Sequence, residues 1–407
     1  MFEYLHSTPK DHNFFSGYYD TDPFSKCGKM HLALKVPSIH KLPSKNDYAE
    51  VGLFQLNEKK LSFHSLAKTN AFNWQQGCKL QWARVESSAI CYNEFYDGKL
   101  RSVIVNLVTG TKREMPKPIY TLSNNGIWAY CIDFDRHYWL RRGYAYDSAP
   151  NDDKNGNILA RDGIWRMCMK SGKYSQIIDI SQLIELKPKN SMIGATHFVE
   201  HIATSPDDTK ISFLHRWQTD IYRHSRLLVC NSDGSQIRVI NDVGRMSHFC
   251  WFDNDNIFGW GGRPNLANKM RNGSNFKRAI FNLVIPIYKM LVKSNSQTGN
   301  SKLSSTLTGD SYLIMNANDG HLEKFQVNDL DRDGHPTVAK DFIVTDTYPD
   351  RDGVMKLLVI ECSSRNLKVI DSIKTDLEYC DTAMRCDLHP KVSMNQNLIS
   401  VDTLKNN

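Results

Sequence analysis

The sequence predicts an all-β fold, a single seven-bladed β-propeller over residues 1–407, and three observations lead to it. Seven stretches of the chain repeat one pattern, in which a small polar cluster and a turn precede an apolar strand. The shortest spacings between these stretches are about 40 to 45 residues, the length of one four-stranded blade. Long amphipathic helical patterns are nearly absent, which argues against alternating helices and strands.

The repeats differ in detail but keep their turn residues. Asn-Asn-Gly, Pro-Asp-Asp and Asp-Asn-Asp mark the turn in the third, fourth and fifth, and such residues tolerate turn geometry. The alternative fold is two unrelated β-sandwiches, which would not require a sevenfold repeat. Little chain follows the last repeat, so we expect a strand from residues 1–16 to complete its blade. The repeats are "PFSKCGKMHLALKV" from Pro23, "KLQWARVESSAICYN" from Lys79, "TLSNNGIWAYCIDF" from Thr121, "ATSPDDTKISFLHRW" from Ala203, "SHFCWFDNDNIFGW" from Ser247, "GHPTVAKDFIVTDTYPD" from Gly334 and "LHPKVSMNQNLISVDT" from Leu388.

Composition is that of a globular protein, with 41% apolar and 23% charged residues. The first residues include Glu3 and no long apolar run, so no secretory signal is expected. The ten cysteines are scattered without CxxC pairs, which favours free thiols in a reducing compartment over disulfides or a structural zinc site. We therefore expect a cytoplasmic protein.

The positive charge belongs to one segment. Asn256 to Gly309 contains no acidic residue, and the sequence predicts a basic, helical insertion over residues 262–305. Within it, residues 268–293 place cations beside an apolar run that is too short to span a bilayer. Such a segment suits a helix lying on an anionic membrane surface, which would make the protein peripheral to the inner membrane. The alternative is a helix packed on the propeller. Nucleic acid is not expected as a partner, because no second basic face accompanies the segment.

Polar residues beside the first strand of each blade are the candidates for a site, because these strands converge in a propeller. The stretch "NWQQGCKLQW" offers Trp74 as a stacking platform for a sugar, with Gln75 and Gln76 as partners for its hydroxyl groups. The alternative is a core tryptophan with glutamines bonded to the backbone. Arginine matches a carboxylate in a bidentate manner and so predicts an acidic ligand. The further candidates for substrate binding are Arg136, His137, Arg142, Arg216 and Tyr348.

Several motifs taken together resemble the oligogalacturonate-lyase-like family of bacterial seven-bladed propellers. They are "SGYYDTDPFS", "NWQQGCKLQW", "FLHRW", "SHFCW", "DGHP", "TDTYPD" and "RCDLHP", in this order. The likeness is greatest to cytoplasmic members associated with capsule and O-antigen synthesis. The resemblance implies a divalent metal, manganese or a similar ion, near His248 and His335, with His389 in the same local pattern. The relatives' cluster of a glutamine and two histidines is replaced before His335 by "DLDRDGHP".

The resemblance also implies a reaction, the β-elimination of a uronic acid residue. A carboxylate must be neutralised so that the proton beside it becomes acidic, and a base must remove that proton. Arg385 or a metal is the candidate for neutralisation, and His215 or His248 for the base. Asp346 and Asp350 could form a glycosidase pair, although turn capping explains them as well.

Two functions follow from these observations. The first is a carbohydrate-active propeller that acts on or binds a uronic-acid-containing polysaccharide, with lyase-like elimination as its reaction if it is an enzyme. The alternative is a non-catalytic propeller in capsule or O-antigen synthesis, which binds the glycan, serves as a scaffold or is associated with a glycosyltransferase. The absence of the relatives' glutamine–histidine cluster favours the alternative.

Overall fold

The structure is a computed structural model that describes residues 3–37, 41–57, 60–86, 88–147, 162–219, 223–263, 309–380 and 382–404. The chain forms two compact units. Unit 1 consists of Met1–Asn155, Ile164–Ile177 and Ile373–Asn407, and unit 2 of Gly156–Gly163 and Ile178–Ser372. The predicted basic insertion, residues 262–305, and its membrane-binding part, 268–293, lie almost entirely outside the described residues. Among the residues that are described, no helix combines the length and apolar character needed to cross a bilayer.

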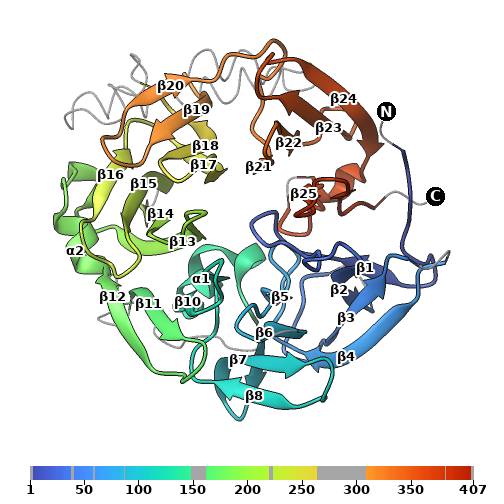
Figure 1. Ribbon diagram of the computed structural model, residues 1–407. Coiled ribbons are helices and arrows are strands. Elements are labelled where there is room, and N and C mark those ends of the chain that lie inside the picture. The colour runs from blue at the N-terminus through green and yellow to red at the C-terminus, as the bar shows by residue number, and fades with distance from the viewer. Residues whose placement is uncertain are drawn as a thin grey trace. The chain divides into compact units, whose positions relative to one another are not determined.

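Unit 1 is built on three four-stranded sheets, in the orders β1-β2-β3-β4, β5-β6-β7-β8 and β12-β11-β10-β9 (Figure 1). A short helix, α1 (Asp135–Leu140), and a 3₁₀ turn, η1 (Arg142–Tyr144), follow β10. The strands are β1 (Asn13–Phe15), β2 (Met30–Val36), β3 (Ala49–Gln55), β4 (Phe63–Thr69), β5 (Gln81–Trp82), β6 (Ala89–Tyr96), β7 (Lys99–Asn106), β8 (Lys112–Met115), β9 (Thr121–Leu122), β10 (Trp128–Cys131), β11 (Gly163–Cys168) and β12 (Tyr174–Asp179).

Unit 2 has the same construction, with the sheets β13-β14-β15-β16, β17-β18-β19-β20 and β21-β22-β23-β24. Helix α2 (Ile180–Glu185) and the 3₁₀ turn η2 (Asn190–Met192) precede its first sheet. The strands are β13 (Thr196–Thr204), β14 (Lys210–Gln218), β15 (Arg223–Asn231), β16 (Arg238–Asn241), β17 (Met246–Trp251), β18 (Asn256–Gly261), β19 (Ser311–Asn316), β20 (Leu322–Lys324), β21 (Thr337–Val338), β22 (Phe342–Asp346), β23 (Val354–Glu361) and β24 (Leu367–Lys374).

The expectation of seven blades is wrong, because the residues that the structure describes form six four-stranded sheets. The seventh repeat, from Leu388, forms only a two-stranded sheet of β25 (Lys391–Val392) and β26 (Ile399–Ser400) in unit 1. The N-terminal strand expected to complete it is β1, which pairs with β2 in the first sheet instead. The sequence pattern marks where a sheet begins, and it does not reveal how many strands then join that sheet.

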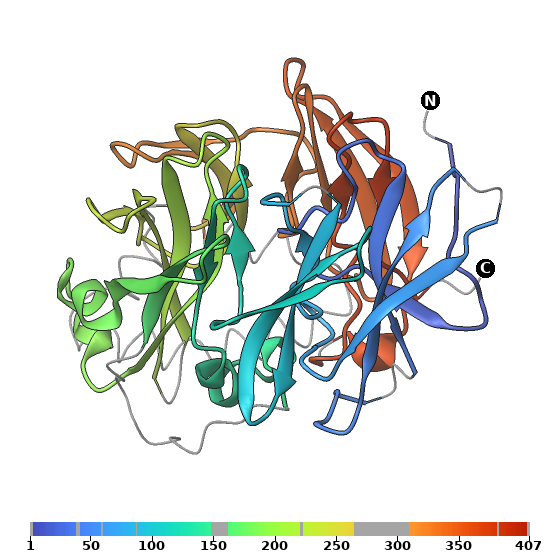
Figure 2. The same ribbon diagram turned by 60° about the horizontal axis from the view of Figure 1, so that its bottom comes forward.

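The middle sheet of each unit is apolar on both faces, because alternate residues of a strand point to opposite sides. In β6, Ile90 and Tyr92 pack toward the β1–β4 sheet, whereas Ala89 and Cys91 pack toward the sheet of β9–β12. In unit 2, Ile257 and Phe258 of β18 divide in the same way between their two neighbouring sheets. Figure 2 shows the strands of the β5–β8 sheet in cyan, with the twist usual for β-sheets.

The two-stranded sheet is fastened to the N-terminal segment through a buried lysine. Lys391 is 2% exposed, and its Nζ donates to Ser16 Oγ (2.8 Å), to the carbonyl oxygen of Gly17 (2.7 Å) and to Asp402 Oδ2 (3.2 Å). Asp402 Oδ1 also accepts from the backbone N–H of Ser16 at 2.8 Å. A buried ion pair with these additional hydrogen bonds therefore connects the first and last parts of unit 1.

Candidate functional site

Two of the predicted metal ligands, His248 and His335, lie together in unit 2. Both are buried, at 5% and 1% exposure, and their ring centroids are 4.2 Å apart. His248 belongs to β17, and His335 lies two residues before β21. The register between β17 and β18 shifts between Met246 and Phe249, so His248 sits in a β-bulge. Bulges redirect side chains and are frequent beside active sites.

Each of these imidazoles is held by a carboxylate, that of the buried Asp346 or that of Asp333, whose side chain is 11% exposed. His335 Nδ1 lies 3.0 Å from both Asp346 Oδ1 and Asp346 Oδ2, and the backbone N–H of His335 donates to Asp346 Oδ1 at 2.7 Å. His248 Nδ1 lies 3.0 Å from Asp333 Oδ1. Because the carboxylates accept from Nδ1, the lone pair of each ring is on Nε2.

Gly334 explains why "DGHP" can place His335 against the end of β22. A Cβ at this position would lie 1.9 Å from the carbonyl oxygen of Asp346. Only glycine allows the two backbones to approach so closely, and this approach brings the backbone N–H and the ring of His335 onto the Asp346 carboxylate.

Burial and the carboxylates set the charges of this site. Burial lowers the pKa of His248 to about 3, although the Asp333 carboxylate opposes that shift. Burial alone would raise the pKa of Asp333 and of Asp346, but their histidine partners outweigh it and hold both pKa values below the usual range. His248 is therefore neutral and both carboxylates are ionised at neutral pH.

A third histidine, His201, lies beside this pair. Its ring faces that of His248 edge-on, with 6.1 Å between the centroids. His201 stands in a bulge of β13 with a φ of +54°, a conformation uncommon for residues other than glycine. Its Nε2 is 3.4 Å from Oε1 of Glu200, and Glu200 also forms a buried ion pair with Arg216. Arg216, predicted to bind substrate, is thus engaged with a carboxylate of the protein itself.

Tyr348, another predicted substrate-binding residue, also reaches the pair. Its hydroxyl oxygen is 3.5 Å from His248 Nε2, and its ring centroid is 5.5 Å from that of His335. His201, His248, His335 and Tyr348 therefore form one cluster, which we call the histidine cluster, with Glu200, Arg216, Asp333 and Asp346 as its charged partners.

His215, predicted as a catalytic base, lies in a different network of unit 2. The Nε of Arg226 donates to His215 Nδ1 at 3.1 Å, and His215 Nε2 is 2.9 Å from Nδ1 of His197. His197 Nε2 is in turn 3.2 Å from the carbonyl oxygen of Met192. Burial, together with the Arg226 charge, lowers the pKa of His215 well below its usual value. A guanidinium can only donate, so His215 Nδ1 is fixed as an acceptor and Nε2 as a donor. We therefore leave His215 out of the functional proposal below.

The histidine cluster offers two ligands for a divalent metal ion, the imidazole nitrogens of His248 and His335. Neutral imidazole nitrogens and carboxylate oxygens are ligands that Mn²⁺ and similar ions accept. A histidine that binds a metal through one nitrogen commonly donates the other N–H to a carboxylate, as His248 and His335 do here. His248 Nε2 and His335 Nε2 are the atoms that would hold the ion.

The remaining predicted residues lie in unit 1, and most are bonded to the protein itself. Gln75 and Gln76 are each 2% exposed; Gln75 Nε2 donates to the carbonyl oxygen of Arg385 (2.8 Å), and Gln76 Nε2 donates to Tyr120 Oη (2.8 Å). Trp74 Nε1 donates to the carbonyl oxygen of Lys41, at 2.6 Å. The alternative is met only in part, because Gln75 bonds to backbone, Gln76 bonds to a side chain, and Trp74 is only partly buried.

Arg385 and His389 both lie near the carboxylate of Asp387, in unit 1. Arg385 binds Asp387 in a bidentate manner, at 2.6 and 2.7 Å. His389 Nε2 is 4.0 Å from Asp387 Oδ2, and its ring lies 4.9 Å from that of Tyr18. Arg136 and His137 are buried on α1, whereas Arg142 is half exposed and pairs with Asp147 at 3.3 Å.

Sequence reasoning did not single out Asp333 or Glu200 as site residues. Asp333 stands in "DLDRDGHP", where closely spaced acids and a glycine look like a turn. Glu200 lies within the strand-like "THFVEHIATS", and a glutamate directly after the apolar residues Phe198 and Val199 is the signal that could have indicated a buried ion pair.

Comparisons with known proteins extend these observations. No protein-family model matches the chain, and no curated protein matches it in sequence. Among solved structures, oligogalacturonate lyase from Vibrio parahaemolyticus is similar, with a TM-score of 0.59, 14% identity, and coverage of 96% of this chain and 88% of that one. An oligogalacturonate lyase in complex with manganese has a TM-score of 0.57 and 13% identity, over 96% of this chain and 87% of the other. At such identity the likeness establishes the fold alone, an all-β propeller, in which the described part of this chain forms six four-stranded blades.

Proposed function

We propose that this protein is a metal-dependent carbohydrate lyase that acts on a uronic-acid-containing glycan by β-elimination. The observation that carries the proposal is the histidine cluster, in which the ring centroids of His248 and His335 lie 4.2 Å apart and Nδ1 of each ring contacts a carboxylate. The manganese bound by a structurally similar oligogalacturonate lyase supports the same assignment.

A bound divalent ion would supply the positive charge that neutralises the uronate carboxylate and makes the adjacent C–H acidic. His201 is the base in this proposal, because its imidazole faces His248 and is oriented by Glu200. It takes the proton from the carbon beside the carboxylate. The electron pair of that C–H bond forms the new double bond as the glycosidic C–O bond breaks, and the leaving oxygen departs with the released sugar and takes a proton from water.

The ion pair between Arg216 and Glu200 supports His201 in the role of the base. Arg216 neutralises Glu200, so the buried carboxylate beside the imidazole carries no uncompensated charge. Tyr348, with its hydroxyl 3.5 Å from His248 Nε2, is placed to bind a hydroxyl or carboxylate oxygen of the substrate.

The sequence resemblance suggests the biological setting. We propose that the substrate is an acidic glycan of capsule or O-antigen synthesis and that the protein acts in the cytoplasm. Residues 268–293 would hold it against the anionic face of the inner membrane.

The test is an elimination assay. The protein is incubated with uronate oligosaccharides and Mn²⁺, and the unsaturated product is followed by its absorbance at short ultraviolet wavelengths. We expect product with the unaltered protein, and loss of product in His248→Ala, His335→Ala and His201→Ala. His321→Ala, an exposed histidine of the same unit, is the matched control and should keep full activity. Glycan binding without product from any uronate substrate would refute the lyase and favour a non-catalytic, glycan-binding propeller.

A further inference from the structure

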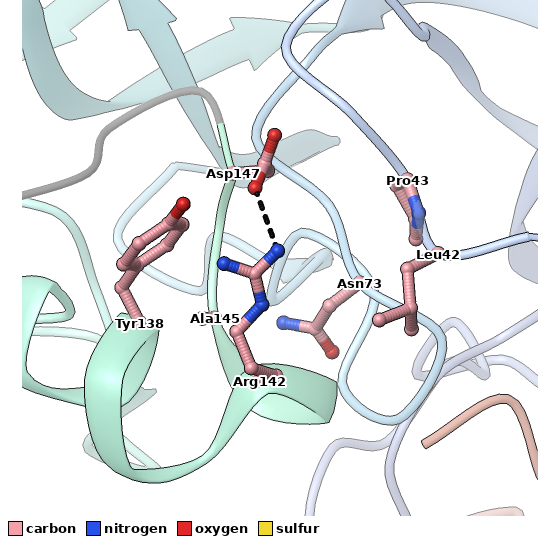
Figure 3. A pocket seen from close by; sticks show the side chains of 7 residues that line it. All are labelled: Leu42, Pro43, Asn73, Tyr138, Arg142, Ala145 and Asp147. Carbon is pink, nitrogen blue, oxygen red and sulfur yellow. Dashed lines mark hydrogen bonds and ion pairs between the residues drawn. The ribbon is translucent and has the colours of Figure 1, made fainter. Parts of the chain in front are cut away.

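A described pocket of unit 1 leaves no room for an organic ligand. Figure 3 shows this hollow, which is lined by Tyr138, Arg142 and Asp147 among others and has a volume of about 10 Å³, enough for one water molecule. An open surface of the same unit offers more. The turn between β11 and β12 lies beside β8, where a lysine and two aromatic rings come together (Figure 1).

Two contacts hold the β11–β12 turn against β8 and the residues that follow it. Arg113 of β8 donates from Nη1 to the carbonyl oxygens of Met169 (2.8 Å) and Lys170 (3.2 Å). Pro116, just after β8, meets the turn at Gly172, where an added Cβ would lie 3.4 Å from the Cδ of the proline. The two segments therefore form one continuous surface.

Trp165 of β11 and Tyr174 of β12 form an aromatic corner on this surface. Their rings meet edge-on, with centroids 5.8 Å apart and planes at 68°. Lys117 Nζ lies over both rings, 4.2 Å from the Trp165 centroid and 5.5 Å from that of Tyr174. Tyr174 is 47% exposed, so its ring can be reached from solvent.

The surface has a net positive charge. Glu86 pairs with Arg113, and Glu114 of β8 pairs with Arg101, so these carboxylates are already engaged with arginines. Three lysines on the surface belong to no ion pair formed by the described residues. They are Lys117, over the aromatic corner, and the exposed Lys170 and Lys173 of the turn. Unpaired cations beside an open aromatic ring fit an anionic partner.

We propose that this surface binds an acidic glycan chain, with one uronic acid residue stacked on Tyr174. The apolar C–H face of a sugar ring suits an aromatic ring, and the carboxylate of that residue would pair with Lys117. Lys170 and Lys173 would meet the carboxylates of neighbouring sugar residues. A chain is favoured over a single sugar because each exposed ion pair is weak and several must act together.

The proposal takes the uronate class of the glycan from the proposed function. It goes beyond that function by assigning a second contact for the glycan, in unit 1, that uses neither a metal nor the histidine cluster.

Bio-layer interferometry with immobilised polygalacturonate tests the proposal on the full-length protein in EDTA, where no metal-dependent turnover occurs. We expect binding to polygalacturonate and none to immobilised dextran, a neutral polysaccharide. The double variant Lys170→Glu, Lys173→Glu replaces two attractive charges by repulsive ones at exposed positions and should weaken binding by about tenfold or more. Tyr174→Ala should weaken it by about threefold or more, because the stacking ring is lost.

Two matched control variants test whether the place of these residues matters. Lys26→Glu, Lys29→Glu makes the same change of charge in another exposed turn of unit 1. Tyr96→Ala removes another exposed tyrosine of this unit, whose ring also has a cation over it, Arg101 at 4.6 Å. Both controls should bind polygalacturonate within about twofold of the unaltered protein at physiological salt, where distant charges are screened.

The proposal is overturned if polygalacturonate does not bind, if dextran binds as well, or if the control variants lose as much affinity as the surface variants. Tighter binding of duplex DNA or anionic vesicles through the same residues would also overturn it, since the surface would then serve another partner.

The elimination assay on short uronate oligosaccharides keeps this proposal apart from the lyase. Lys170→Glu, Lys173→Glu should retain activity on them, and loss of that activity would contradict a separate surface. Polymer binding by a protein that forms no elimination product would refute the lyase and leave this surface in place.

Discussion

In the histidine cluster, single carboxylate residues fix the orientation of the imidazole rings and the nitrogen that carries the proton. Asp346 receives both the backbone N–H and the Nδ1 of His335, so one carboxylate fixes the main chain and the ring together. In the metal site proposed above, Nε2 would be the ligand atom of His335. The position of the ring therefore depends on a residue that would not itself touch the substrate.

Asp346→Asn tests that dependence at the residue scale. The amide can still accept from the backbone N–H, but it no longer supplies the negative charge that favours a proton on Nδ1. We expect Mn²⁺ affinity to fall by about 10- to 100-fold, as is typical when the partner of a metal-binding histidine is altered. Calorimetric titration with Mn²⁺ measures the affinity of the variant and of the unaltered protein. Asp352→Asn, at an exposed position in the following turn, is the control. Unchanged affinity in Asp346→Asn would show that the carboxylate does not orient the ligand.

Asp22 of unit 1 gives a pH-dependent prediction. Burial raises its pKa to about 6, although the backbone N–H of Phe24 and nearby Arg84 partly oppose the shift. The folded state then holds a proton that the unfolded state has lost, so stability falls as the pH rises from about 4 to 6 and stays at the lower level above that range.

Asp22→Asn should remove this part of the pH dependence, because the amide is neutral and its oxygen can still accept from Phe24. We expect the variant to gain roughly 1–3 kcal/mol in the free energy of unfolding at pH 7 relative to the unaltered protein. The difference between them should narrow toward pH 4. Urea unfolding at several pH values gives the comparison, and parallel curves for the two proteins across that range would contradict it.

At the scale of elements, two irregular strands and one glycine loop assemble the histidine cluster. His201 and His248 lie in bulges of β13 and β17, and His335 follows Gly334. Regular strands would send neighbouring residues alternately to the two faces of a sheet, whereas bulges interrupt that alternation and turn a buried-strand residue toward a site.

Gly334→Ala should displace this loop. The added Cβ would lie 1.9 Å from the backbone oxygen of Asp346, so the two segments must separate. We expect a loss of roughly 1–3 kcal/mol in the free energy of unfolding, as for overpacked positions, together with weaker Mn²⁺ binding. Gly110→Ala is the comparison, since a Cβ there meets no atom within 4 Å and reports only the cost of its φ of +69°. Equal metal affinity in Gly334→Ala and the unaltered protein would show that the close approach is not needed.

The buried ion pair between Lys391 and Asp402 gives a prediction about how the first and last parts of unit 1 are held together. Lys391→Met removes the cation and leaves Asp402 buried without its partner. Breaking a buried pair from one side costs about 3–5 kcal/mol, so a large fall in the urea midpoint is expected. The double variant with Asp402→Leu should recover part of the loss, because no unpaired charge remains. A double variant less stable than Lys391→Met alone would contradict this explanation.

At the scale of the whole molecule, the sequence was sufficient for the fold class and insufficient for the number of blades. Turn residues such as Asn124, Asn125 and Gly126 identify sheet starts because their geometry is local. Strand pairing is not local: β1 could in principle extend either end of the fold, and it joins β2. The seventh repeat therefore has the right pattern and only two strands.

The site was predictable to a similar degree. His248 and His335 stand out in "SHFCW" and "DGHP", and the structure brings them together. Asp333 looked like a turn residue, because its partner His248 is 85 positions away in the sequence. His215 looked suitable as the base, since sequence does not show that Arg226 occupies its Nδ1. Which ring nitrogen is engaged depends on tertiary contacts.

The most direct test of the account is an Mn²⁺ titration followed by electron paramagnetic resonance, in which the sharp signal of free Mn²⁺ is lost on binding. The account predicts one saturable site in the unaltered protein and in His321→Ala, and no such site in His248→Ala or His335→Ala when each is shown to be folded. Saturable binding that persists in both cluster variants, or none in the unaltered protein, would contradict it.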